Sequence, residues 1–228
     1  MNDRVNADSI VHRLQEALDR KQKRLCLVLI GGCSRSGKSA LVERLSSRLN
    51  GVGIRNGVVR LDSWLIGVDQ RKDKSTVLER YEGQAIVESI HGLLRGKTIF
   101  PPIYNAKTRR RRAERGKTGI RIASGVLIVE GVIALAFEPL VRMADLRIFV
   151  SVSDPERLER LRDFYFRNKG FTSKETEEII QSREKEEVPF IKETAKKADI
   201  VVVDPAVGAE RTIPSGSEGK NEFLCGLF

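Results

Sequence analysis

The chain has 228 residues, a hydrophobic content of 40%, a charged content of 32% and a formal net charge of +10 at pH 7. This length and composition fit one substantial globular α/β domain. No apolar run reaches the roughly 20 residues that a membrane-spanning helix needs, and the N-terminal segment lacks the apolar core of a secretory signal. We therefore expect a cytoplasmic protein without a membrane partner.

The positive charge is concentrated in one stretch. Residues 107–117 (KTRRRRAERGK) contain seven bases and one acid, and so supply six of the ten excess charges. Such a patch suits an anionic small molecule as well as a polynucleotide. The stretch lacks the interleaved aromatic residues that stack bases, which argues against nucleic acid as the partner.

The first predicted element is a helix that either Asp8 or Ser9 can cap and that runs to about Lys23. Apolar residues recur along one of its faces, as expected for a helix packed on a core. We assign residues 1–24 to this N-terminal helix, ahead of the main domain at 25–204.

The most informative stretch is 25–40 (LCLVLIGGCSRSGKSA), in which an apolar strand breaks into glycines before a helix. From Gly32 to Ser39 it matches the phosphate-binding pattern GxxxxGKS in full. Backbone N–H groups of such a loop point at nucleotide phosphates, Lys38 reaches the outer phosphates, and the Ser39 hydroxyl binds Mg²⁺. The residues assigned to nucleotide binding are Gly32, Cys33, Ser34, Arg35, Ser36, Gly37, Lys38, Ser39 and Ala40.

The three cysteines, Cys26, Cys33 and Cys225, show no metal-ligand spacing. Cys33 lies inside the loop, where neighbouring N–H groups and the Lys38 charge would lower the pKa of its thiol. We favour an inert residue over a redox switch at this position.

Five short apolar segments alternate with helical ones, which predicts a parallel sheet with helices on both faces. The predicted strands are 25–30, 57–62, 126–129, 146–152 and 199–203. The predicted helices of the main domain are 40–49, 78–94, 133–143, 154–168 and 173–197.

Two segments lie outside this alternation. Residues 97–124 contain two prolines and the basic run, and we expect an extended excursion or hairpin apart from the main sheet. Residues 205–228 are rich in glycine and serine, and we expect a flexible tail.

Two carboxylates follow predicted strands and should reach the same edge of the sheet as the loop. Asp62 is a candidate base that accepts a hydroxyl proton, the alternative being a cap for the next turn. Glu130 follows a buried strand, where an unpaired charge would be costly, so we expect it to hold Mg²⁺ directly or through water.

The segment 157–170 (RLERLRDFYFRNKG) places several arginines on a helix and the turn after it. Arginines on a mobile cover can reach transferring phosphates and exclude water. The alternative is a solvated helix face paired with neighbouring acids. For any single arginine both interpretations remain open.

Several segments together resemble the uridine kinase and phosphoribulokinase family of P-loop kinases. They are GGCSRSGKS, LDSWL, LLRGKTIFPPIYNAKTRRR, VLIVEGVIAL, RLERLRD and VPFIKETAKKADIVV, in this order over about residues 25–204. The pairing of a PxY segment with an IVEG strand is more specific than the loop alone.

This resemblance implies a P-loop NTPase fold with a five-stranded parallel core, a substrate-binding excursion at 97–124 and a helical lid at 157–185. It also implies transfer of the γ-phosphate of Mg·ATP to a hydroxyl group of a small molecule. Family members are often oligomeric, which makes a homo-oligomer a candidate assembly.

The resemblance also assigns roles by position. Asp62 matches the catalytic aspartate, Ser39 and Glu130 match the magnesium residues, and Tyr104 matches a residue of the acceptor site. Arg162 and Arg167 fall near the lid arginines and, with Lys38, are further candidate catalytic residues.

The chain departs from the uridine-cytidine kinases at the acceptor site. After the PxY tyrosine those enzymes carry an aspartate and a histidine, whereas Asn105 and Arg109 stand near these places here. A nucleoside is the leading acceptor. A sugar phosphate or a pantothenate-like acid, bound by Arg109 and Arg111, is the alternative.

Three rival functions remain. A regulatory NTPase would need a positioned water in place of an acceptor site. A basic nucleic-acid-binding module would grip phosphates with residues 107–117, and its binding would weaken steeply with salt. A non-catalytic relative is disfavoured because Lys38, Ser39, Asp62 and Glu130 are all present.

Overall fold

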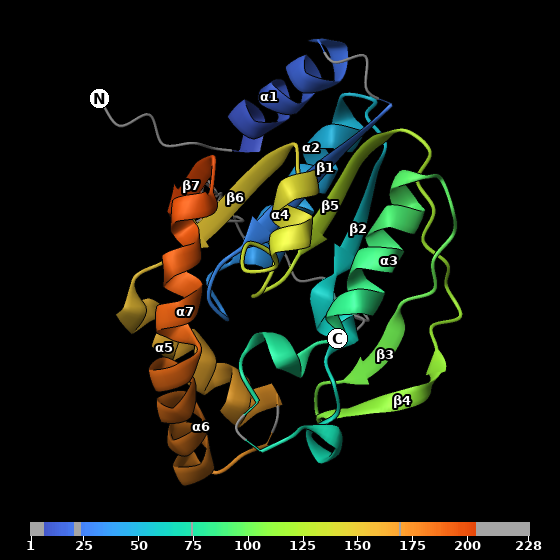
Figure 1. Ribbon diagram of the computed structural model, residues 1–228. Coiled ribbons are helices and arrows are strands. Elements are labelled where there is room, and N and C mark those ends of the chain that lie inside the picture. The colour runs from blue at the N-terminus through green and yellow to red at the C-terminus, as the bar shows by residue number, and fades with distance from the viewer. Residues whose placement is uncertain (1–6, 21–23, 74, 169, 204–228) are drawn as a thin grey trace, which may run out of the picture.

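A five-stranded parallel sheet forms the centre of the molecule (Figure 1). The computed structural model describes residues 7–20, 24–73, 75–168 and 170–203. The strand order is β2-β5-β1-β6-β7, and every neighbouring pair is parallel. The strands are β1 (Leu25–Gly31), β2 (Asn56–Arg60), β5 (Gly125–Glu130), β6 (Leu146–Ser151) and β7 (Ile200–Val203). The predicted fold class is confirmed.

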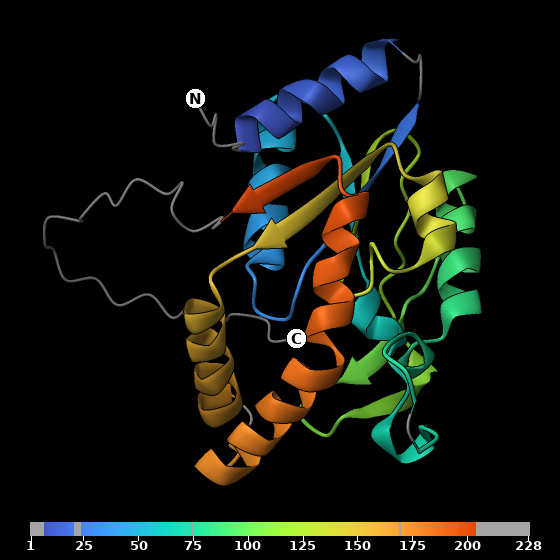
Figure 2. The same cartoon turned by 60° about the vertical axis from the view of Figure 1, so that its left-hand side comes forward.

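The central strand β1 is apolar on both faces because helices cover both sides of the sheet. Val28 and Ile30 face one layer with α1 (Ala7–Arg20) and α2 (Lys38–Gly51). Leu27 and Leu29 face the other layer, with α3 (Gly83–Leu94), α4 (Glu138–Met143) and α7 (Val188–Glu193). Figure 2 shows α3 and α4 on the side of the sheet away from α2.

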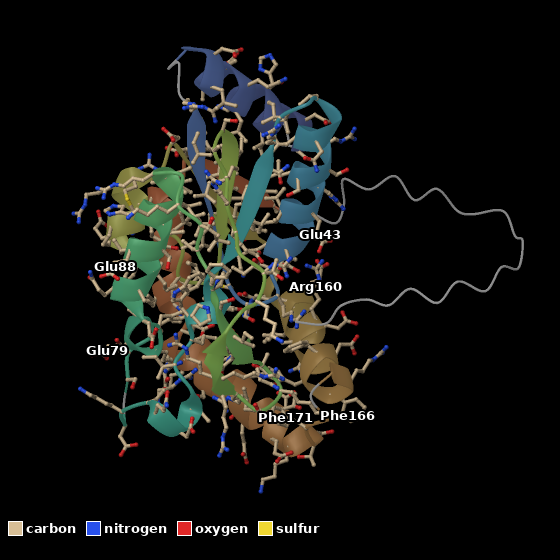
Figure 3. The ribbon with its side chains drawn as sticks, turned by 90° about the vertical axis from the view of Figure 1, so that its right-hand side faces the viewer. Glu43, Glu79, Glu88, Arg160, Phe166 and Phe171 are labelled. Carbon is tan, nitrogen blue, oxygen red and sulfur yellow. The ribbon has the colours of Figure 1, made fainter. Side chains whose placement is uncertain are left out.

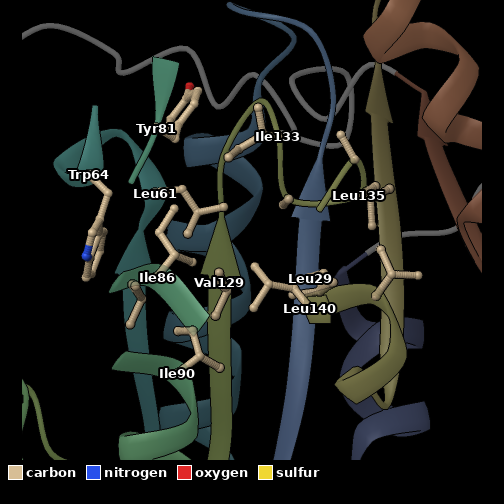
Figure 4. Packing of buried hydrophobic residues seen from close by; sticks show 14 of the residues in the cluster. Leu29, Leu61, Trp64, Tyr81, Ile86, Ile90, Val129, Ile133, Leu135 and Leu140 are labelled. Carbon is tan, nitrogen blue, oxygen red and sulfur yellow. The ribbon is translucent and has the colours of Figure 1, made fainter. Parts of the chain in front are cut away.

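The packing of the second layer is dense and apolar (Figure 4). Ile86 and Ile90 of α3 and Leu140 of α4 pack in one buried cluster with Leu29 and Val129 of the sheet. None of these five side chains is exposed to solvent. This layer holds the strands rigidly, so the residues at their carboxyl ends keep fixed relative positions.

Three predicted helices are shorter in the structure. The helix expected at 78–94 is a 3-10 turn (Leu78–Arg80) followed by α3. The helix expected at 133–143 is only α4, and the one expected at 173–197 is α6 (Ser173–Glu186), α7 and a 3-10 turn (Thr194–Lys197). A proline occupies the first turn of both α4 and α7, where its missing N–H disfavours a continuous helix from the preceding turn.

The excursion at 97–124 is a hairpin, as expected. Its strands β3 (Pro102–Asn105) and β4 (Arg110–Arg115) pair antiparallel in a sheet of their own. A bridge between Ile99 and Ile120 closes its base.

The helical segment predicted to form a lid follows β6 and is called the lid below. It consists of α5 (Asp154–Asp163), a π-helical turn (Phe164–Asn168) and α6, and it has a small apolar core of its own that includes Leu161 and Ile180. The largely exposed Phe166 and the partly buried Phe171 lie at the end of the lid far from α1 (Figure 3).

The predicted tail, 205–228, lies outside the described residues. Among the helices that the structure describes, none is both long and apolar enough to cross a membrane.

One ion pair joins the last two strands. The Nε and Nη2 atoms of Arg147 donate to the Asp199 carboxylate at 3.0 and 2.6 Å, and the backbone N–H of Arg147 donates to it at 2.8 Å. These hydrogen bonds lower the pKa of Asp199. A depressed carboxylate pKa contributes stability that is present above the unfolded-state value and lost as pH falls below about 4.

Asp199→Asn should therefore lower the free energy of unfolding by about 1 to 2 kcal/mol at pH 7 and by clearly less at pH 3. Urea denaturation at both pH values measures the difference. Asp8→Asn, which removes an exposed pair with Arg48, is the control and should change stability by less than about 0.5 kcal/mol. An equal loss at both pH values would contradict the role given to the ion pair.

Candidate active site

The P-loop turns between β1 and α2 on two glycines with positive φ. Gly37 has φ 99° at the N-terminus of α2, and Gly32 has φ 140° at the end of β1. A Cβ atom on Gly32 would lie 2.3 Å from the carbonyl oxygen of Val150 in β6. Both positions therefore favour glycine strongly, and the loop follows the close path needed to wrap a phosphate group.

The Lys38 side chain lies across this loop. Its Nζ atom donates to the carbonyl oxygens of Gly32 at 3.0 Å and Cys33 at 2.8 Å. Burial lowers the pKa of Lys38, and the negative charges of Asp62 and Glu130 oppose that shift. The ammonium group thus lies close to both carboxylates that were predicted to act with it.

Glu130 ends β5 as a buried carboxylate between two partners. The Ser39 hydroxyl donates to its two oxygens at 3.3 and 3.2 Å, and Arg60 Nε lies 3.3 Å from its Oε1. Burial raises the pKa of Glu130, while Arg60 and Lys38 oppose the rise. The strand register explains the cluster, because Glu130 is opposite Arg60 of β2 and Ile30 of β1.

The donor set suits Mg²⁺. A hydroxyl and a carboxylate offer hard oxygen ligands, and magnesium in nucleotide sites takes only one or two protein ligands besides water and phosphate. No group of three or more His, Cys, Asp or Glu side chains in the described residues could hold a metal by itself. Ser39 and Glu130 are brought together as predicted, and their metal role stays a prediction.

Asp62 projects from a 3-10 turn (Leu61–Trp64) directly after β2. Leu61 and Trp64 are buried and anchor the turn, whereas Asp62 itself is exposed. The Tyr81 hydroxyl donates to Asp62 Oδ1 at 3.5 Å. Burial, followed by the Asp62 charge, raises the pKa of Tyr81 well above its ordinary value, so Tyr81 remains a hydrogen-bond donor near neutral pH.

The two predicted lid arginines are not brought to the loop. Arg162 Nε lies 2.6 Å from Glu177 Oε1, and Arg167 Nε lies 3.4 Å from Asp163 Oδ1. Both guanidinium side chains are at least half exposed. Their catalytic role stays a prediction that this arrangement does not support.

A third lid arginine, Arg183, is influenced by charges of the site. Burial lowers the pKa of Arg183 on α6, but Glu187, Tyr165, Tyr81 and Asp62 raise it overall. Arg183 is therefore close enough to Asp62 to respond to its charge. The sequence offered no signal for it, because it is one of several basic residues on a charged helix.

Two further contacts hold the lid together and join it to the loop. The buried Arg157 donates to both oxygens of Glu184 at 2.7 Å, which ties α5 to α6. The Arg35 guanidinium lies 3.4 Å from the centre of the Phe164 ring. These contacts connect the P-loop, α5 and α6 into one structure.

The predicted acceptor residues lie on the hairpin. The Tyr104 hydroxyl accepts a hydrogen bond from Arg71 Nη2 at 3.5 Å. Arg111 forms an ion pair with Glu82, next to Tyr81. Arg109 occupies the turn between β3 and β4 with φ 55°. Arg71 was not predicted, since it lies in a polar loop without a recognisable motif.

The expectation for Cys33 is wrong in direction. Burial raises the pKa of its thiol, and the positive charges of Arg157, Lys38 and Lys192 only partly offset the rise. Cys33 lines a cavity of 20 Å³ beneath the loop with Ser36 and Arg157. A buried thiol with a raised pKa is inert, as the favoured interpretation held.

A larger cavity of 470 Å³ lies at the opposite edge of the sheet. It is lined by Leu25, where β1 begins, and by arginines that include Arg24, Arg95 and Arg121. Ligands of open parallel sheets bind at the carboxyl ends of the strands. The candidate active site is therefore the smaller, charged region around the P-loop.

The loop, its lysine and the carboxylates after β2 and β5 define a P-loop nucleotide-binding protein. The family model described as "AAA domain" matches residues 28–181. A uridine kinase of Ureaplasma parvum serovar 3 is 31% identical over 155 residues, which cover 64% of this chain and 73% of the relative. The chain belongs to the uridine kinase and phosphoribulokinase family of P-loop kinases.

Solved structures share the fold at low identity. A candidate fructose transport system kinase from Silicibacter sp. TM1040 is 17% identical with a TM-score of 0.69, covering 86% of this chain and 98% of that one. A D-glycerate 3-kinase from Cryptococcus neoformans is 14% identical with a TM-score of 0.55, covering 76% and 84%.

The buried charge of Glu130 should make the free protein less stable than it could be. The partner Arg60 is already half exposed to water. Removing the Glu130 carboxylate therefore does not leave a buried charge without its only partner. Glu130→Gln should therefore raise the free energy of unfolding by about 1 kcal/mol at pH 7. Because the pKa of Glu130 is raised in the folded state, this gain should disappear at pH 4 and below.

Urea denaturation of the ligand-free protein tests this expectation. Glu138→Gln, which removes an exposed pair with Lys197, is the matched control and should stay within about 0.5 kcal/mol of the wild type. A loss of stability in Glu130→Gln would mean that the carboxylate is a net stabiliser in the free protein.

Proposed function

We propose that this protein transfers the γ-phosphate of Mg·ATP to a hydroxyl group of a small molecule. The observation that carries the proposal is the meeting of Lys38, Ser39, Asp62 and Glu130 at one edge of the sheet. A phosphoryl-transfer site needs a cation for the phosphates, a metal position and a group that receives the proton of the acceptor. Each of these needs has a candidate side chain here.

The nucleotide side of the site rests on the loop. Backbone N–H groups of residues 32–39 would bind the phosphates, and Lys38 would exchange its two loop carbonyls for phosphate oxygens. Ser39 and Glu130 would hold Mg²⁺, which neutralises charge on the phosphates when bound.

The acceptor side rests on Asp62. Its carboxylate is exposed at the edge of the site, where it can accept the proton of an acceptor hydroxyl as the new P–O bond forms. The Tyr81 hydrogen bond orients one carboxylate oxygen and leaves the other for the acceptor. This arrangement favours a kinase over a regulatory NTPase, which would require a positioned water.

The segments around the site have separate roles in this proposal. We assign the catalytic domain to residues 25–204, acceptor binding to the hairpin region at 97–124 and exclusion of water to the lid at 157–185. Within the lid, we favour Arg183 over Arg162 for stabilising the transferring phosphate, because Arg162 is half exposed and paired with Glu177.

Two acceptor classes have support. The relatives named uridine kinase favour a nucleoside. The solved structures named for fructose and D-glycerate show that the same fold occurs in kinases named for other alcohols. The arginines beside Tyr104 favour an acceptor with a negative charge.

Asp62→Asn should lower kcat by about 100-fold or more and leave ATP binding intact, because the amide cannot accept the proton. The measurement is ADP release from Mg·ATP with uridine, cytidine, other nucleosides, ribulose 5-phosphate, pantothenate or no acceptor. Asp19→Asn on the exposed side of α1 is the control and should match the wild type. ADP release that needs no acceptor would contradict a kinase and favour the NTPase.

The lid arginines can be compared in a matched pair. Arg183→Gln should lower kcat about tenfold or more, whereas Arg162→Gln should change it by no more than about twofold, because Arg162 is turned to Glu177. Steady-state kinetics with the best acceptor measures both variants. A larger loss in Arg162→Gln would show that the lid reorganises and that the predicted arginine reaches the phosphates.

A further inference from the structure

Three separate segments bring arginines together beside Tyr104. Arg71 follows a 3-10 turn (Val68–Gln70), Arg80 ends the 3-10 turn before α3, and Arg109 lies at the tip of the hairpin. The backbone N–H of Val68 donates to the Arg109 carbonyl at 3.0 Å, and that of Ile66 donates to the Arg80 carbonyl at 2.9 Å. These hydrogen bonds fix the loop at 66–71 against both other segments.

The Arg71 side chain is held in place by neutral groups. Its Nε donates to the Ile66 carbonyl at 2.9 Å, and its Nη2 donates to the Tyr104 hydroxyl at 3.5 Å. A guanidinium group has five N–H donors, so these two bonds orient it and leave donors for a ligand. The residue is only partly exposed, so its position is set by the protein.

Three of the neighbouring arginines are paired with carboxylates, and two are not. Carboxylates of Glu186, Asp69 and Glu82 pair with Arg80, Arg110 and Arg111 respectively. Within the described part of the chain, neither Arg71 nor Arg109 has a carboxylate partner.

The direction of the pKa shift of Arg71 agrees with the lack of a carboxylate partner. Burial lowers the pKa of Arg71; the phenols Tyr104 and Tyr81 act against that shift, whereas Arg109 and Arg80 add to it. Like charges held together at a partly buried position repel each other, and a bound anion would remove the repulsion. Arg112, by contrast, is exposed and fits a solvated charge.

This cluster lies beside the proposed base. Tyr81 bridges the two regions, because its hydroxyl contacts Asp62 while its backbone pairs with Leu65 at the start of the loop that carries Arg71. An acceptor with its hydroxyl at Asp62 would therefore extend past Tyr81 towards Arg71.

We propose that Arg71 and Arg109, together with the Tyr104 hydroxyl, form an anion subsite that binds a phosphate or carboxylate group of the acceptor. The inference rests on the proposed kinase function and names its substrate class, an alcohol that already carries a negative charge. Planar guanidinium groups bind both kinds of oxyanion with paired hydrogen bonds.

Matched acceptor pairs test the subsite. The pairs are uridine with uridine 5′-monophosphate, ribose with ribose 5-phosphate, and glycerol with glycerate, so that phosphate and carboxylate are distinguished. In the wild type, at least one charged member should have a KM about tenfold or more below that of its neutral partner. Arg71→Gln should remove most of this advantage, and Arg71→Lys should restore part of it. Arg48→Gln, which changes an exposed arginine of α2 outside the hairpin, is the control and should keep it.

Calorimetry separates the subsite from catalysis. With the P-loop saturated by a non-hydrolysable ATP analogue, inorganic phosphate or acetate should bind the wild type at least about tenfold more tightly than Arg71→Gln, because a charged hydrogen bond is lost. Equal binding by the two proteins would overturn the subsite. Phosphoryl transfer could instead depend on Asp62 and prefer neutral acceptors, with the same preference in Arg71→Gln. That result would overturn the anion subsite and leave the kinase function standing. ADP release that needs no acceptor, together with loss of anion binding in Arg71→Gln, would overturn the kinase function and leave the anion subsite standing.

Discussion

The pairing of β5 with both β1 and β2 is the constraint on which the site depends. It sets Glu130 opposite Ile30 on one side and Arg60 on the other, at the level where the P-loop begins. A carboxylate at that depth loses most of its water, and Ser39, Arg60 and Lys38 are the groups that compensate it. The strands thus create both the charge and the setting in which a divalent cation would be favoured.

Helix α6 connects the lid to the layer of helices packed on the sheet. Arg157 is buried against Glu184, which fastens α5 to α6, and α6 ends at Glu186 just before α7 enters the core under the sheet. Arg183 lies one turn before that break. Its position is therefore coupled both to the lid and to the rigid layer that contains Val188 and Ile191.

Much of the site could be predicted because its residues are local in sequence to strand ends. Lys38, Ser39, Asp62 and Glu130 each follow an apolar segment that could only be a buried strand, and parallel strands bring such ends together. Arg183 and Arg71 could not be predicted in this way. Their positions depend on the angle of the lid and on loop pairing, and many basic residues of this chain would satisfy the same pattern. The helix boundaries failed for a related reason, because a proline in the first turn disfavours a helix that apolar spacing would continue.

The hairpin is a separate two-stranded sheet and shares no ladder with the central one. Its tip carries Arg109, and its contact with the loop at 66–71 includes a hydrogen bond to the backbone carbonyl of Arg109, a group that a residue of any type at this position would provide. Under the proposed assignment of acceptor binding to the hairpin, sequence changes at the tip would alter which acceptor is recognised without disturbing the hydrogen bonds around Lys38, Ser39 and Glu130. In that assignment, recognition and chemistry are separable modules, so new specificities would arise by exchanging a few residues between related chains.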